Sequence, residues 1–127
     1  MNSLTGALEL CGDTALTGMP APLAIDSYKR YIFAGRRVAD EYGLSSFRID
    51  RGTGGLSLIG VVPLHGNPIH ISTDRTGSYL LSACYCQGRV GVHAIKDYGA
   101  LCNPPIEWHE TGIGAHYIQT DPSNCYA

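Results

Sequence analysis

Two of the five histidines occupy equivalent places in the sequence and are the residues best suited to chemistry. His70 lies in the segment 66–74 and His116 in the segment 112–121, and an aspartate ends each segment. An imidazole changes its charge near neutral pH, so two of them facing one space could act as general acid and general base. The alternative is that each is an ordinary polar residue at the start of a strand, bonded to the backbone.

The positions of the two histidines relative to their aspartates argue against both side chains lying on the same face of a strand. His70 is four residues ahead of its aspartate, whereas His116 is five residues ahead. Side chains alternate between the two faces of a strand, so the two imidazoles would point to opposite sides unless a bulge intervenes.

The aspartates that follow these histidines belong to a repeat. An aspartate is followed five residues later by a tyrosine at Asp26, Asp74 and Asp121, with steps of 48 and 47 residues. The Thr-Gly-Ala-Leu of residues 5–8 returns as Thr-Gly-Gly-Leu at 53–56, again after 48 residues. Self-similarity at this period, with many turn residues and tyrosines, predicts the blades of a β-propeller. The inner strands of a propeller line its channel, so both histidines are expected there.

We therefore predict an all-β fold: a β-propeller fragment of four-stranded antiparallel blades, about two full and two partial. The expected parts are a blade tail at 1–18, a blade at 19–64, a blade at 66–111 and a partial blade at 113–127. In the second full blade the fourth strand is expected at 101–108, where Asn103-Pro104-Pro105 breaks it or confines it to an edge.

Two complete blades cannot close a ring, because propellers have about four to eight blades. We expect the missing blades of the same propeller to lie upstream and downstream of this segment and to be its partners. Expressed alone, the chain is predicted to be poorly soluble and catalytically inactive, because its end faces are bare and its channel is incomplete.

Charge and hydropathy exclude several classes of protein. The net charge is only −2 and no basic stripe is present, so no nucleic-acid partner is expected. No apolar run approaches the roughly 18 residues of a membrane span, so no membrane partner is expected either. Residues 1–10 lack the basic and apolar regions of a secretory signal. These features predict a cytoplasmic protein.

The five cysteines, at positions 11, 84, 86, 102 and 125, are expected to be reduced thiols in that compartment. The spacing Cys84-Tyr85-Cys86 could form half of a metal site. No second pair at finger spacing accompanies it, which favours small buried residues of a packed sheet instead. No metal site and no cofactor are predicted.

Residues 66–85 resemble a known blade signature. Their sequence is Gly-Asn-Pro-Ile-His-Ile-Ser-Thr-Asp-Arg-Thr-Gly-Ser-Tyr-Leu-Leu-Ser-Ala-Cys-Tyr, which is similar to the pattern of the seven-bladed propeller lactonases, the 6-phosphogluconolactonase-like family. Residues 114–122 resemble the family's His-Ala-His segment, followed by Asp-Pro. Two positions depart from the pattern: Gly114 replaces the first histidine of that segment, and Cys84 replaces the asparagine before Tyr85.

The resemblance implies hydrolysis of a small-molecule lactone, a sugar lactone such as 6-phosphogluconolactone, within carbohydrate metabolism and the pentose phosphate pathway. His116 would be the base or a positioning group, and His70 would line the catalytic site. Tyr85 would bind substrate, as a possible donor to the carbonyl oxygen that gains negative charge. Gly114 favours a different class, a non-catalytic propeller scaffold or binding module. A third alternative is a lactonising enzyme similar to the carboxymuconate cyclases.

Four cations could clamp a phosphorylated sugar. Lys29, Arg30, Arg36 and Arg37 flank the strand that follows the first repeat aspartate. Because they flank a second strand rather than a channel strand, a solvated blade edge is the preferred interpretation.

Overall fold

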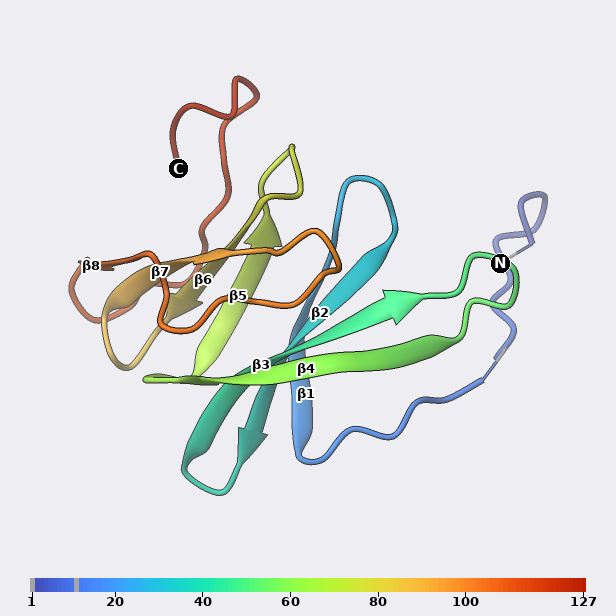
Figure 1. The fold of residues 1–127 in the computed structure, drawn as a ribbon, viewed down its shortest axis with the longest axis horizontal. Coiled ribbons are helices and arrows are strands. Elements are labelled where there is room, and N and C mark those ends of the chain that lie inside the picture. The colour runs from blue at the N-terminus through green and yellow to red at the C-terminus, as the bar shows by residue number, and fades with distance from the viewer. Residues whose placement is uncertain (1, 11) are drawn as a thin grey trace.

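The computed structural model describes residues 2–10 and 12–127 and consists of two four-stranded sheets (Figure 1). The first contains β1 (Met19–Ile25), β2 (Tyr31–Val38), β3 (Glu41–Ile49) and β4 (Leu56–Leu64), in that order. The second contains β5 (Pro68–Thr73), β6 (Tyr79–Cys84), β7 (Arg89–Ala94) and β8 (Glu107–Glu110). Neighbouring strands are antiparallel throughout. The described residues contain no helix, and the predicted all-β fold of four-stranded antiparallel blades is confirmed.

The repeated aspartate closes the turn between the first two strands of each sheet. The Oδ1 atom of Asp74 accepts hydrogen bonds from the backbone N–H groups of Ser78 and Tyr79, both at 2.8 Å. The same two bonds form from Arg30 and Tyr31 to Asp26, and from Cys125 and Tyr126 to Asp121. The spacing seen in the sequence is therefore the spacing of a turn whose amides need a carboxylate acceptor.

The fourth residue of this turn has a left-handed backbone in all three copies. The φ angle is 54° at Lys29, 70° at Gly77 and 62° at Asn124. Glycine adopts such angles without the steric cost that a Cβ atom brings, and asparagine is the commonest substitute. Lysine is therefore the least suitable of the three residues for its position.

Replacing Lys29 by glycine is expected to raise the free energy of unfolding by about 1 kcal/mol, since left-handed backbone costs an ordinary residue about that much. Urea denaturation measures the change. Lys96→Gly is the matched control, because Lys96 is also exposed but is not among the residues with positive φ. A Lys29→Gly protein that is no more stable than the parent would contradict the prediction.

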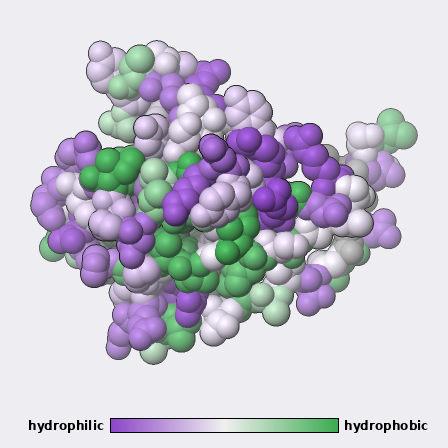
Figure 2. All heavy atoms as spheres, viewed as in Figure 1, coloured by the Kyte–Doolittle hydropathy of each residue, from purple (hydrophilic) through white to green (hydrophobic). Residues whose placement is uncertain are grey.

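The main core lies between the two sheets. Phe33, Leu44 and Leu80 are fully enclosed there, with exposed fractions of 0%. The remaining buried members of the cluster are Tyr31, Leu64, Ile71, Cys84 and Leu101. In Figure 2, apolar residues form a band across the middle of the view, over β4 in Figure 1, with hydrophilic residues around it.

The fourth strand of the second sheet begins later than predicted. The sequence placed it at 101–108, whereas β8 covers Glu107–Glu110. Leu101 forms only an isolated bridge with Ile95, and the chain then leaves the sheet through a cis Asn103–Pro104 bond. Proline has no N–H to donate to a ladder, so regular pairing resumes only after Pro105.

Candidate active site

His70 lies on β5 at a local break in the strand register. The pairing of β5 with β6 shifts between Pro68 and His70 and is regular from His70 to Thr73, so no bulge separates His70 from Asp74. His116 lies outside any strand, in the segment that follows β8. Strand alternation therefore does not separate the two imidazoles. They are close enough that the charge of His116 influences the protonation of His70.

The half-buried imidazole of His70 is held by the next segment of the chain. Its Nδ1 atom accepts a hydrogen bond from the backbone N–H of Ile118, at 3.4 Å. The ring of Tyr117 packs against it with centroids 4.2 Å apart and a tilt of 37°. Ile118 is itself anchored on β5, because the hydroxyl of Ser72 donates to its carbonyl at 2.7 Å.

His116 and Tyr85 meet beside this pair. Their ring centroids are 5.8 Å apart and the rings are nearly perpendicular, at 88°. Both side chains are exposed, and Tyr85 directly follows the end of β6. The N–H of Gly114 donates to the carbonyl of Tyr85 at 3.1 Å, which ties the loop carrying His116 to the end of that strand.

The three residues singled out from the sequence are thus neighbours in the structure, where β5 begins and β6 ends. The sequence did not identify Tyr117, which joins the His70 and His116 pairs. The only signal for it is its position next to His116. Its contact with His70 depends on how residues 117–119 lie against β5, and in Figure 1 this C-terminal segment runs past β6.

The electrostatics favour a neutral His70. Burial lowers the pKa of His70 below its ordinary value, and the neighbouring His116 lowers it further. A neutral imidazole can donate from one ring nitrogen and accept at the other, so His70 can bind a substrate oxygen without carrying charge. The exposed His116 remains accessible to water.

The two departures from the lactonase pattern each have a structural counterpart. Gly114 has φ = 108°, a backbone conformation that residues with a side chain rarely adopt, and a Cβ atom there would meet open space. Cys84 is fully buried in the core between the sheets, where a small apolar side chain suits the packing. Burial raises the pKa of the Cys84 thiol to about 11.

Three of the four basic residues considered as a phosphate clamp are engaged within the first sheet and its flanks. Arg30 pairs with Asp26 at 3.0 Å. Arg36 donates to the carbonyl of Thr17, and Arg37 donates to the carbonyl of Ala39. These contacts support the interpretation as a blade edge.

No group of three or more His, Cys, Asp or Glu residues within 2–10 and 12–127 is arranged to hold a metal ion. Cys84, Cys86, Cys102 and Cys125 are free thiols, while Met1 and Cys11 lie outside the described residues. The predicted lack of a metal site stays a prediction. The same part of the chain forms no helix of the length and apolarity that crossing a bilayer requires.

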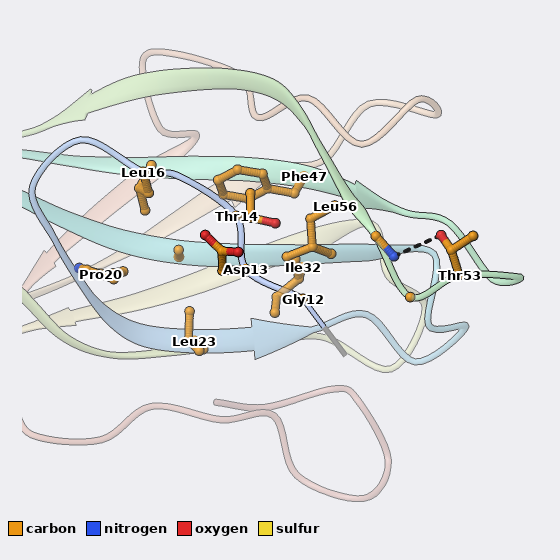
Figure 3. Close-up of a pocket in the computed structure, with 13 residues that line it drawn as sticks. Gly12, Asp13, Thr14, Leu16, Pro20, Leu23, Ile32, Phe47, Thr53 and Leu56 are labelled. Carbon is orange, nitrogen blue, oxygen red and sulfur yellow. Dashed lines mark hydrogen bonds between the residues drawn. The ribbon is translucent and has the colours of Figure 1, made fainter. Parts of the chain in front are cut away.

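A cavity of about 480 Å³ lies on another surface, between the first sheet and the N-terminal segment (Figure 3). Leu16, Leu23, Ile32, Phe47 and Leu56 supply most of its apolar wall, and Asp13 reaches over it. No described residue in its lining is a histidine, cysteine, lysine or arginine. Its lining therefore offers apolar contacts but no base or nucleophile among these residue types. The cluster of His70, His116, Tyr85 and Tyr117 remains the candidate site.

Comparison with known proteins assigns the family. Residues 1–126 match the family described as lactonase, 7-bladed β-propeller. A 6-phosphogluconolactonase of Serratia proteamaculans is 36% identical over 119 residues, covering 94% of this chain and 35% of that protein. The corresponding Yersinia pestis protein is 34% identical over 120 residues, covering 94% of this chain and 34% of its own length. The chain thus spans about a third of these relatives.

Solved structures agree on the fold. The periplasmic gluconolactonase of Pseudomonas aeruginosa superposes with a TM-score of 0.69 at 20% identity, over 81% of this chain and 30% of that one. A Lactobacillus plantarum protein superposes with a TM-score of 0.65 at 26% identity, over 78% and 28% of the two chains. The resemblance found in residues 66–85 is confirmed, and the chain belongs to the family of seven-bladed β-propeller lactonases.

Proposed function

We propose that this chain contributes His116, His70 and Tyr85 to the active site of an enzyme that hydrolyses a sugar lactone, with 6-phosphogluconolactone as the substrate. The observation that carries the proposal is the convergence of these three side chains at one end of the second sheet. The names of the curated relatives support the choice of substrate. We place the reaction in the cytoplasm, within the pentose phosphate pathway of carbohydrate metabolism.

Hydrolysis of a lactone needs a base and a donor. The exposed imidazole of His116 takes a proton from water as the water oxygen attacks the carbonyl carbon. The carbonyl oxygen then gains negative charge, which hydrogen-bond donors must stabilise, and the His70 imidazole and the Tyr85 hydroxyl are suited to this. When the ring C–O bond breaks, His116 returns the proton to the leaving oxygen, and the product is a hydroxy acid.

We propose that further blades of the same propeller complete this site. In this interpretation 19–64 and 66–111 are full blades, 1–18 is a blade tail and 113–127 opens the next blade. Hydrogen bonds that connect β5 to the preceding and following units support it. The hydroxyl of Thr73 donates to the carbonyl of Ile25, 48 residues away, and that of Ser72 donates to the carbonyl of Ile118, 46 residues away.

The test is a chimera in which this segment replaces the matching third of the Serratia proteamaculans relative. We expect the chimera to hydrolyse 6-phosphogluconolactone well above the spontaneous rate. His116→Gln should lower kcat by about 10²- to 10⁴-fold, because glutamine cannot act as a base. His109→Gln is the matched control and should leave kcat unchanged, because His109 is an exposed residue of β8 that pairs with Glu107.

A chimera that unfolds cooperatively but hydrolyses no lactone would overturn the proposal. It would favour the binding or scaffold alternative, which Gly114 in place of a histidine supports. Ring closure of a carboxylated diene acid by the same chimera would instead identify a lactonising enzyme.

A further inference from the structure

The two histidines of the candidate site have unlike surroundings, and the difference assigns them different roles. We infer that His70 is a fixed hydrogen-bond donor, which presents Nε2–H to the lactone carbonyl oxygen and never exchanges its proton during the reaction. Ile118 and Tyr117 hold it in that state, and His116 alone acts as the base. This inference rests on the proposed lactone hydrolysis and deepens it.

The hydrogen bond at Nδ1 determines which nitrogen of the His70 ring carries the proton. A ring nitrogen that accepts a hydrogen bond carries no proton, so the bond from the Ile118 N–H to Nδ1 leaves the proton of the neutral ring on Nε2. The Ile118 N–H that donates to Nδ1 is itself held in place. Ile118 is only 9% exposed and packs with Leu81 and Ala83, while its carbonyl accepts the Ser72 hydroxyl.

Tyr117 fixes the orientation of the His70 ring. The Tyr117 ring lies over the imidazole at a centroid distance of 4.2 Å, and the Tyr117 hydroxyl donates to the Gln119 side-chain carbonyl. A flip of the imidazole about its Cβ–Cγ bond would put Cδ2 in the place of Nδ1, break the bond to Ile118 and disturb this contact. Tyr117 is therefore a positioning residue, which acts on the substrate only through His70.

His116, unlike His70, lies where water can reach its ring. Its ring is exposed and meets Tyr85 edge-on, so it is open to the water that it must deprotonate. Burial lowers the pKa of His70, and a charge on His116 lowers it again. When His116 takes the proton from water, His70 is therefore disfavoured from gaining one, and it keeps the neutral donor form throughout. The proton that His116 gains is the one it delivers to the leaving oxygen.

The test reads the ring nitrogens directly. In the 127-residue chain labelled with ¹⁵N in its histidines, long-range ¹H–¹⁵N spectra at pH 8 should show His70 with an unprotonated Nδ1 and a protonated Nε2. Exposed His65 serves as the reference for a ring that averages its tautomers. Solid-state ¹⁵N spectra of sedimented protein give the same information if the chain associates.

Two variants examine the role of Tyr117. Tyr117→Phe keeps the ring and should keep the His70 signature. Tyr117→Ala removes the ring and should shift both His70 nitrogens toward the averaged values of His65. A parent protein in which His70 Nδ1 is protonated, or in which His70 averages like His65, would overturn the inference whatever the activity proves to be.

A kinetic comparison in the active chimera tests whether His70 acts as a hydrogen-bond donor. His70→Ala should lower kcat by about 10²- to 10³-fold, the usual effect of removing one oxyanion donor. His70→Gln offers an amide N–H in place of Nε2–H and should lose much less. The acid limb of the pH–rate profile should persist in His70→Gln and disappear in His116→Gln.

A His70→Gln protein that is as inactive as His70→Ala and has lost its acid limb would show that His70 is a base. If no variant and no parent protein hydrolyses lactone, the proposed function has failed, while the ¹⁵N spectra still decide the state of His70.

Discussion

Replacing Asp74 by alanine is expected to lower the free energy of unfolding by about 3–5 kcal/mol, enough to unfold a marginally stable domain. The carboxylate is 2% exposed and accepts hydrogen bonds from three backbone amides, of Thr76, Ser78 and Tyr79. It also accepts the Thr76 hydroxyl and the side-chain amide of Asn124. Alanine would leave these donors without their charged acceptor, and a lost bond to a charged group costs about 1.5–3 kcal/mol.

Urea denaturation followed by the fluorescence of Trp108, the single tryptophan, measures this effect. Asp121→Ala is the matched control. Asp121 makes the same turn, but its bonds to Cys125 and Tyr126 are longer, at 3.1 and 3.2 Å, and exposed. Replacing Asp121 should therefore lower the free energy of unfolding by clearly less than replacing Asp74. Equal effects of the two substitutions would show that burial of the Asp74 turn adds nothing to the free energy of unfolding.

The Asp74 turn should also weaken in acid. Burial alone would raise the pKa of Asp74, but hydrogen bonds from Thr76, Tyr79 and Asn124 more than offset it and hold the pKa below its ordinary value of 3.8. A carboxyl whose pKa is depressed by folding stabilises the protein above its unfolded pKa. That contribution is lost as the pH falls below about 4.

A second loss of stability is expected at milder pH, and it is expected to come from His93. Its side chain is fully enclosed, with Nε2 3.1 Å from the Ser82 hydroxyl and its ring edge-on to Trp108 at 5.9 Å between centroids. Burial lowers the pKa of His93 from 6.5 to about 4. Between those values the unfolded chain binds a proton that the folded protein excludes, so the free energy of unfolding falls as the pH falls.

One pKa unit corresponds to about 1.4 kcal/mol, so His93 should remove about 3 kcal/mol of stability between pH 6.5 and 4. His93→Gln keeps a polar group near Ser82 but cannot titrate, and it should flatten most of this slope. His109→Gln, at an exposed histidine, should leave the slope as it is. Urea titrations at a series of pH values supply the data, and an unchanged slope in His93→Gln would contradict the assignment.

The sequence alone was sufficient for the features that depend on local structure. The repeated aspartate bonds amides only four and five residues away, so its spacing to the tyrosine records the turn directly. The Thr-Gly-Gly-Leu repeat at 53–56 is local in the same way, because β4 begins at its leucine, Leu56. The blade signature at 66–85 was sufficient to identify the family.

Only the tertiary structure decided how the site is assembled. The one-residue mismatch between His70 and His116 does not separate the two side chains, because His116 lies outside any strand and alternation applies only to residues within strands. The contact of Tyr117 with His70 joins residues 47 positions apart in sequence, and it exists because the C-terminal segment lies against β5. Side-chain periodicity records which face of a strand is buried. The packing of one blade on the next determines which side chains from different blades meet.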